Sequence, residues 1–262
     1  MASVVIPTYK RPESLRRCLE SLRLQTEQRF EIILVEEKGP LACLRNSGWK
    51  LATTKIIAFT DDDVVFTSHW LTEVISSFKD YRVQGTSGPA IVPDLLRKNR
   101  DIFRWKWAKS LYNFMFLGDK SLLPGYITKA GAWTTGACYE GSSYEGRVDF
   151  LEACNMAWRR EVLEAVDGFD EGYTGIGDWS EPDLAFRVRK LFGNDCLWFN
   201  PRAKLYHEVS QQGAYQWRKE DSQNRLKNYY RFSDKWVSPC WQNKMYKAFL
   251  KIYYLLKGSI KW

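Results

Sequence analysis

Apolar residues along the first third of the chain alternate between short continuous runs and helical spacings. Between the runs, apolar positions three or four residues apart predict helices that begin at Pro12 and Leu41 and another that includes Trp70. Strands and helices that alternate with short connections are typical of an α/β fold with a mainly parallel sheet covered on both faces. The continuous β-branched and apolar runs predict buried strands at 3–6, 30–35, 55–60 and 83–88.

This rhythm is lost between about residues 89 and 147, where Trp, Tyr, Gly and Lys are frequent. A stretch this long without a regular period favours substrate-binding loops, with an irregular packing layer as the alternative. Regular elements then return, with helices expected at 157–166 and 183–192 and a short strand at 197–200.

The chain shows no repeat, linker or low-complexity segment, so we expect residues 1–262 to form a single domain. Its expected parts are a half of alternating strands and helices at 1–90, a second half at 91–208 that contains the irregular stretch, and a helical C-terminal extension at 209–262.

Composition narrows the class of partner. The chain has 39 Lys and Arg against 31 Asp and Glu, a formal net charge of +8 that suits a nucleotide or an anionic membrane surface. No nucleic-acid recognition motif accompanies this charge, so we expect no nucleic acid partner. The six cysteines form no CxxC pair, which indicates reduced thiols in a cytoplasmic protein. The chain starts with a predicted strand, so we expect no signal peptide, and no apolar stretch is long enough to span a bilayer.

Acidic residues gather where the predicted strands end. Asp61, Asp62 and Asp63 follow the run at 55–60, and Glu36 follows the run at 30–35. The carboxyl ends of parallel strands share one edge of a sheet, where α/β proteins bind ligands. Three adjacent carboxylates repel one another, and a hard divalent cation that holds a diphosphate would compensate this repulsion. On its own, a run of three aspartates is more often a solvated turn than a metal site.

Four segments occur in a fixed order along the chain: VVIPTYKRPESLRRCLESL at 4–22, DDDV at 61–64, CNMAWRREVLEAVDGFDE at 154–171 and SEPDLAFRVRKLF at 180–192. Together they resemble the inverting, nucleotide-sugar-dependent glycosyltransferases of family 2, which have the GT-A fold, and the resemblance extends from residue 2 to about 208. DDDV matches the Asp-x-Asp motif of that family, and the fourth segment matches its acidic helix start. The resemblance implies that 1–90 is the nucleotide-sugar-binding half and that 91–208 is the acceptor-side and catalytic half.

The resemblance implies a donor site that holds a UDP- or GDP-linked sugar with Mn²⁺ or Mg²⁺. Asp63 would bind the metal together with Asp61, and His207 is either a further ligand or a plain cleft residue. Glu36 stands where the family usually has Asp, which leaves the nucleobase open, and Arg45 either contacts the donor or is a surface helix arginine. The implied donor-binding residues are Pro7, Thr8, Tyr9, Glu36, Arg45, Asp61 and Asp62. Of these, Asp61 would contact the ribose or lie near the metal, and Asp62 fits a role in the strand turn better than a contact with the donor.

The resemblance also implies catalytic and acceptor-binding residues. Glu181 stands where the family usually has its catalytic Asp, and a carboxylate there can remove a proton from the acceptor hydroxyl. Asp183 is either a second acid or a favourable partner of the helix dipole. Trp179 is either a stacking platform for an acceptor sugar or a packing residue, and Asn155 is expected on the acceptor side.

The expected activity is transfer of one sugar from a nucleoside-diphosphate donor to a hydroxyl of a glycan or lipid-linked acceptor, with inversion. One alternative is a sugar nucleotidyltransferase, but that class needs a Gly-rich phosphate loop where this chain has Pro7, Thr8 and Tyr9. The other is a non-catalytic glycan- or membrane-binding protein of the same fold.

The C-terminal segment at 244–262 is basic and amphipathic. We expect Met245, Phe249, Ile252 and Leu256 to share one helical face, flanked by lysines. Such a helix can lie in an anionic membrane interface, which would make the protein peripheral on the cytoplasmic face of a membrane. The alternative is a helix that packs on the domain or on a second subunit.

Overall fold

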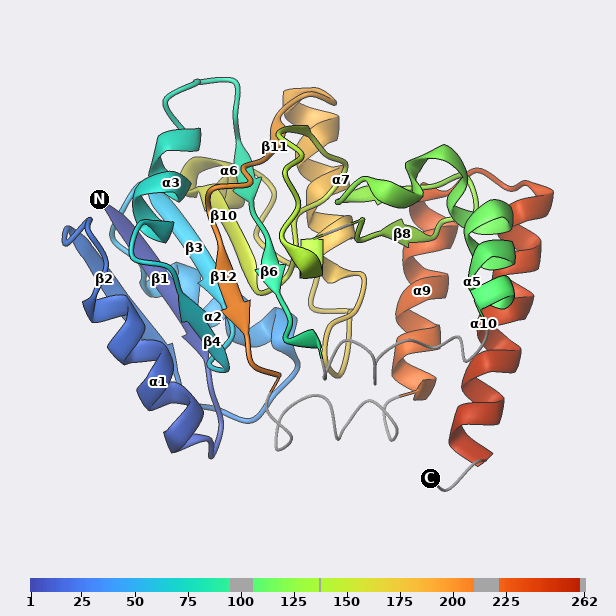
Figure 1. Cartoon of the computed structure of the whole chain (residues 1–262), viewed down its shortest axis with the longest axis horizontal. Coiled ribbons are helices and arrows are strands. Elements are labelled where there is room, and N and C mark those ends of the chain that lie inside the picture. The colour runs from blue at the N-terminus through green and yellow to red at the C-terminus, as the bar shows by residue number, and fades with distance from the viewer. Residues whose placement is uncertain (95–105, 137, 210–221, 260–262) are drawn as a thin grey trace.

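The computed structural model describes residues 1–94, 106–136, 138–209 and 222–259, and its centre is a seven-stranded sheet (Figure 1). The strand order is β2-β1-β3-β10-β5-β11-β9. β2, β1, β3, β5 and β11 run in one direction, while β10 and β9 run in the other. The strands are β1 (Ala2–Pro7), β2 (Phe30–Val35), β3 (Ile56–Thr60), β5 (Gly85–Ser87), β9 (Gly146–Arg147), β10 (Asn155–Arg159) and β11 (Leu197–Phe199).

Helices cover both faces of this sheet, as the sequence predicts. In β1, Val5 belongs to the apolar cluster between the sheet and the helices α2, α6 and α7. Val4 and Ile6 belong to a second cluster on the opposite face, between the sheet and the helices α1 and α3. The two-residue period of the strand therefore supplies two separate cores. The helices are α1 (Pro12–Arg23), α2 (Leu41–Leu51), α3 (Trp70–Ser77), α6 (Arg160–Ala165) and α7 (Ser180–Phe192).

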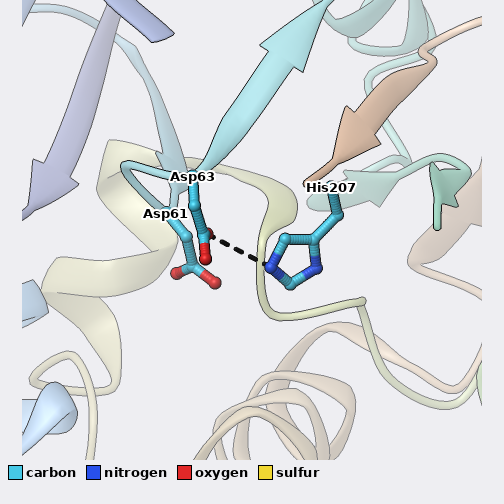
Figure 2. A group of neighbouring side chains, drawn as sticks. All are labelled: Asp61, Asp63 and His207. Atoms are coloured by element: carbon cyan, nitrogen blue, oxygen red, sulfur yellow. Dashed lines mark ion pairs between the residues drawn. The ribbon is translucent and has the colours of Figure 1, made fainter. Parts of the chain in front are cut away.

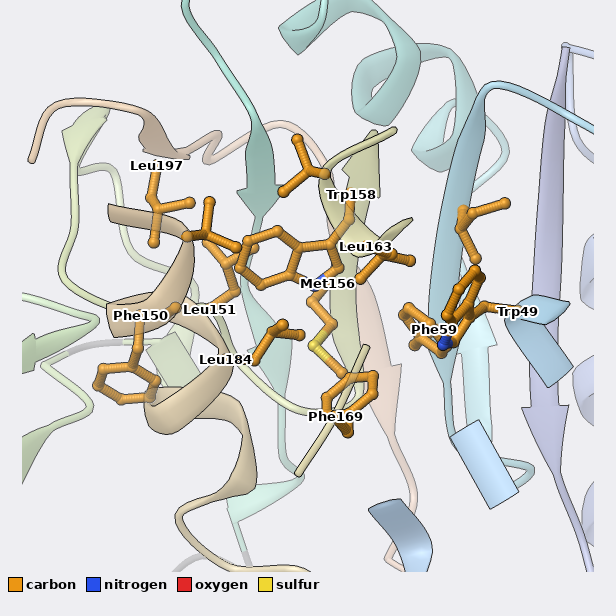
Figure 3. Close-up of a cluster of buried hydrophobic side chains, with 14 of the residues drawn as sticks. Trp49, Phe59, Phe150, Leu151, Met156, Trp158, Leu163, Phe169, Leu184 and Leu197 are labelled. Atoms are coloured by element: carbon orange, nitrogen blue, oxygen red, sulfur yellow. The ribbon is translucent and has the colours of Figure 1, made fainter. Parts of the chain in front are cut away.

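The expectation of a helix at 157–166 is wrong over its first residues. Residues 155–159 form β10, which pairs antiparallel with both β3 and β5, and the helix begins only at Arg160. Met156 and Trp158 are two residues apart, so both point to the same face of the sheet, where they pack with Phe59 and Leu184 in the core (Figure 3). Helix-forming residues follow directly from Arg160, so the sequence pattern places the start of the helix earlier than the structure does. The two-residue period of the strand at 155–159 is therefore hard to recognise.

A second, three-stranded sheet lies beside the first and joins distant parts of the chain. Its order is β4-β12-β6, and β12 runs antiparallel to β4 with His207 opposite Val64. Because β4 begins directly after the three aspartates, this pairing brings the end of β12 to them. The strands are β4 (Val64–Phe66), β6 (Ala90–Ile91) and β12 (Leu205–His207).

The irregular middle of the chain and the C-terminal extension pack together. Tyr246 and Leu250 are buried with Phe116 and Tyr229 in a third apolar cluster, at the end of the molecule far from α1 (Figure 1). None of the described helices is both long and apolar enough to cross a membrane. The elements here are α5 (Lys106–Tyr112), a π-helix (Asn113–Leu117), two 3₁₀-helices (Gly118–Leu122 and Cys138–Glu140), the β7 (Tyr126–Ile127) and β8 (Trp133–Thr134) hairpin, α9 (Ser222–Trp236) and α10 (Trp241–Ser259).

A close approach at Gly48 fixes α2 on the sheet and yields a test of the fold. A Cβ atom there would lie 2.2 Å from Val5 Cγ1 and 3.1 Å from Val35 Cγ2. Gly48→Ala should therefore lower the free energy of unfolding by about 1–3 kcal/mol through overpacking. Helix propensity alone predicts the opposite, a gain of about 1 kcal/mol.

Urea denaturation of Gly48→Ala measures this difference. Ser47→Ala, at the neighbouring exposed position of α2, is the matched control and should stay within about 0.5 kcal/mol of the parent. Equal or greater stability of Gly48→Ala would contradict the close contact between α2 and β1.

Candidate active site

Two carboxylates and one imidazole meet at the end of β3. Figure 2 shows Asp61, Asp63 and His207, and one potential ligand atom from each lies within 4.8 Å of the others. His207 Nε2 is 3.2 Å from Asp63 Oδ1. Asp63 is buried, while Asp61 and His207 are half-buried, so the cluster is shielded but still reaches the surface.

The position of His207 follows from the pairing of β12 with β4. The backbone N–H of Glu208 donates to the carbonyl of Asp63 over 2.9 Å, which fixes the two segments beside each other. On the far side of the ring, His207 Nδ1 lies 3.8 Å from Cys154 Sγ. Burial raises the pKa of Cys154, so this neighbour is a neutral thiol. No motif or spacing in the sequence indicates that Cys154 is a neighbour of this cluster.

The donor atoms of this cluster fit the metals expected from the sequence. Carboxylate oxygens suit Mg²⁺ and Mn²⁺, and an imidazole nitrogen is compatible with the transition metal of the two. Two carboxylates this close together also repel each other, and a bound cation would relieve the repulsion. Asp61, Asp63 and His207 can therefore hold a divalent metal.

Asp62 has a different environment from its two neighbours. Its side chain is fully buried, accepts a hydrogen bond from Thr8 Oγ1 at 2.5 Å, and pairs with Arg11 at 2.6 Å. Burial raises the pKa of Asp62 to about 6, against the opposing effects of Thr8 and Arg11. Asp62 thus ties the end of β1 to the turn after β3, and the expected direct contact with the donor does not fit this geometry.

Arg11 is a site residue that the sequence analysis missed. Besides its pair with Asp62, its Nη1 lies 3.6 Å from Asp63 Oδ2, so it places a positive charge beside the metal cluster. In the sequence, Arg11 is only a basic residue shortly after the first predicted strand, and no motif marks it as part of the site.

The remaining donor-side residues lie at the adjoining ends of β1 and β2. Pro7 pairs with Val35, and the backbone N–H of Thr8 donates to the carbonyl of Val35 over 3.0 Å. Tyr9 and Glu36, which follow these strands, are both exposed. The structure therefore gathers Pro7, Thr8, Tyr9 and Glu36 at one edge of the sheet.

Glu181, the expected base, is at the start of α7 and forms a buried ion pair with Arg45 of α2. The side chain of Arg45 is 1% exposed, and its Nη2 also donates to the carbonyl of Ala153 at 3.3 Å. Arg45 is therefore not a surface arginine; it contacts Glu181, the carbonyl of Ala153 and the ring of Phe169. Burial raises the pKa of Glu181, and the guanidinium of Arg45 opposes this rise.

The segment before β10 connects Glu181 with the metal cluster. Arg45 contacts the carbonyl of Ala153, and the next residue, Cys154, contacts His207. Thr60, the last residue of β3, donates to the carbonyl of Cys154 at 3.0 Å. The ion pair of Arg45 with Glu181 and the metal cluster therefore both contact the same short segment, Ala153 and Cys154.

Asp183 is fully buried and bound by protein groups on several sides. It pairs with Arg187 and Lys235, each at 2.8 Å, and accepts a hydrogen bond from Trp236 Nε1 at 2.7 Å. These contacts tie α7 to α9, so the structure gives Asp183 a structural role and does not support the expected second catalytic acid.

The two expected acceptor residues are buried as well. Trp179 is 4% exposed and packs against Trp133, Tyr229 and Phe232, so the expected stacking platform does not fit. Asn155 accepts a hydrogen bond from Trp70 Nε1 and donates to the carbonyls of Pro89 and Ala203. Its amide is committed to protein partners, which leaves no group for an acceptor.

A family model decides the classification of this chain. The model for glycosyl transferase family 2 matches residues 3–40 and 41–164, more than half of the chain. The chain belongs to glycosyl transferase family 2. The resemblance to this family is therefore confirmed; three of the four segments begin within the matched residues, and the fourth, at 180–192, lies beyond them. No curated protein sequence matched the chain.

Solved structures confirm the GT-A fold of this family-2 glycosyltransferase. The mannosyltransferase PcManGT from Pyrobaculum calidifontis, in complex with GDP-Man and Mn²⁺, is 15% identical with a TM-score of 0.59, over 98% of this chain and 72% of that one. TarS 1-349 from S. aureus, in complex with UDP, is 12% identical with a TM-score of 0.55, over 99% and 72%. GalNAc-T7 with UDP, GalNAc and Mn²⁺ is 14% identical with a TM-score of 0.64, over 100% and 51%.

The pair of Arg45 and Glu181 predicts a change in pH dependence. Arg45→Met removes the positive charge that opposes the effect of burial, so the pKa of Glu181 should rise further. The acidic limb of the kcat/KM profile for sugar transfer should then move to higher pH, by about one to three units.

Arg45→Lys retains the charge and is the matched control, with a smaller expected shift. Thermal midpoints of both variants check that the fold survives. If Arg45→Met lowers donor binding but leaves the pH profile in place, Arg45 acts on the donor and not on Glu181.

Proposed function

We propose that this family-2 enzyme is a metal-dependent, inverting glycosyltransferase. It moves a sugar from a UDP- or GDP-linked donor to a hydroxyl of a glycan or lipid-linked acceptor. The observation that carries this proposal is the cluster of Asp61, Asp63 and His207 at the edge of the sheet where the ends of β1 and β2 also lie. The free state of all six cysteines supports a reducing, cytoplasmic compartment.

The donor would lie across the ends of the parallel strands. Pro7, Tyr9 and Glu36 would line the nucleoside, and Asp61, Asp63 and His207 would hold Mn²⁺ or Mg²⁺ near the diphosphate. When bound, such a metal neutralises charge that develops on the departing nucleoside diphosphate. Two of the solved relatives contain Mn²⁺ together with a nucleotide or nucleotide sugar, which supports this assignment.

Glu181 is our candidate for the base. Its carboxylate would accept the proton of the acceptor hydroxyl while that oxygen attacks the anomeric carbon and the bond to the phosphate breaks. Attack from the side opposite the leaving group inverts the anomeric centre, which converts an α-linked donor into a β-linked product. Burial supports this role, because a carboxylate with a raised pKa is a stronger base than one in water.

The metal assignment predicts the behaviour of Asp63→Ala. This variant should lose most of the Mn²⁺-dependent binding of UDP or GDP and keep its fold, since Asp63 follows the end of a strand. Isothermal titration of each nucleoside diphosphate, with Mn²⁺ or with EDTA, measures the effect. The exposed Asp119→Ala is the matched control and should bind like the parent.

A donor panel tests the activity itself. UDP-, GDP- and dTDP-linked sugars are incubated with the protein and Mn²⁺, and slow hydrolysis is followed without an acceptor. We expect turnover of at least one UDP- or GDP-linked sugar that EDTA abolishes and Asp63→Ala lacks. Turnover that is unchanged by EDTA, or metal-dependent binding that survives in Asp63→Ala, would exclude this metal site.

The base assignment predicts a slow but intact enzyme. Glu181→Gln keeps the size of the side chain and loses the proton acceptor, so the rate of transfer should fall by roughly 10²- to 10⁴-fold while donor binding persists. Steady-state kinetics with the donor identified in the panel measures this change. Glu161→Gln, exposed on α6, is the control, and a Glu181→Gln rate within about threefold of the parent would place the base elsewhere.

A further inference from the structure

An apolar stripe on α10 faces solvent. It consists of Trp241, Met245, Ala248, Ile252 and Leu255, which are spaced alternately four and three residues apart and so share one helical face. The four large side chains are 60%, 41%, 58% and 62% exposed, in this order. Helix-forming sequences normally bury such a stripe, so its exposure requires an explanation.

The opposite face of α10 already has its partners. Asn243, Tyr246 and Leu250 are buried against the domain, and Phe249 lies 5.5 Å from Tyr112, between ring centroids. The face expected from the sequence, which included Phe249, is therefore wrong by part of a turn, and the side chain of Leu256 lies outside the described residues. Packing against the other described residues accounts for this inner face, while Trp241, Met245 and Ile252 on the outer face are 60%, 41% and 58% exposed.

Positive charge runs alongside the apolar stripe. Lys244 and Lys251 are exposed, and within the part of the chain that the structure describes neither pairs with a carboxylate. Lys247 instead pairs with Asp234 of α9 at 2.6 Å and is half-buried. From Trp241 to the end of the sequence there are five lysines and no acidic residue.

We propose that the apolar stripe of α10 binds the interface of an anionic lipid bilayer, with the helix parallel to the membrane. The apolar side chains would enter the boundary between headgroups and acyl chains, and Lys244 and Lys251 would contact anionic headgroups. A second copy that docks through the same helix fits less well, because residues 241–262 of that copy also carry lysines and no acidic side chain to pair with Lys244 and Lys251. This proposal does not depend on the transfer chemistry, since it concerns a separate surface.

Vesicle cosedimentation of the full chain tests the proposal. Binding to vesicles of phosphatidylcholine and phosphatidylglycerol should be clear, binding to phosphatidylcholine alone should be weak, and high salt should reduce the former. Ile252→Asp with Leu255→Asp should lower the partition coefficient by about tenfold or more for each residue. Lys244→Gln with Lys251→Gln should lower it by about 30-fold.

Leu191→Asp is the matched control, because Leu191 is 61% exposed on α7 and lies outside the stripe; it should bind like the parent. Since the substituted positions are exposed, the thermal midpoints of all variants should stay close to that of the parent. The proposal would be overturned if the parent protein did not bind anionic vesicles, or if the variant with Ile252→Asp and Leu255→Asp bound them as strongly as the parent. A dimer of the parent in light scattering, lost in that variant, would instead identify the stripe as a self-association surface.

Discussion

Charge repulsion among three consecutive carboxylates is the constraint on which the rest of this site depends. The protein resolves it in two ways. Asp62 turns inward, where Thr8 and Arg11 bind it, and this contact fixes the turn after β3 to the end of β1. Asp61, which is half-buried, and Asp63, which is buried, instead lie beside His207 in a group suited to a divalent cation. The inward carboxylate therefore holds the geometry that allows the other two to bind a metal.

Glu181 shows the same combination of a buried carboxylate and an arginine. Its partner, Arg45, lies on α2, and the absence of a side chain at Gly48 lets α2 pack closely against β1. Glu181 lies in the first turn of α7. The paired arginine opposes the rise in the pKa of Glu181 that burial causes. In both places, helices and strands that are distant in sequence supply opposite charges to a common region, so the site depends on the packing of the whole sheet.

The sequence was informative where local pattern and strand direction determine position. It predicted the carboxylates at one edge of the sheet, because parallel strands end there, and it predicted two covered faces from the strand–helix alternation. It could not establish that His207 lies beside Asp63, since that depends on the pairing of two three-residue strands. It missed β10, whose two-residue alternation is masked by the helix formers that follow, and it misplaced the outer face of α10. Asp183, Trp179 and Asn155 had suitable chemistry and position in the sequence, but only the structure shows that their side chains are committed to protein partners.

The most direct measurement is the position of Mn²⁺ in crystals grown with UDP or GDP. Anomalous scattering locates the ion without reference to any assumed mechanism. The account predicts one ion at coordination distance from the carboxylate of Asp63 and the imidazole of His207, in contact with both phosphates of the nucleotide. A nucleotide bound at the ends of β1 and β2 without an ion, or an ion held away from Asp61, Asp63 and His207, would contradict it.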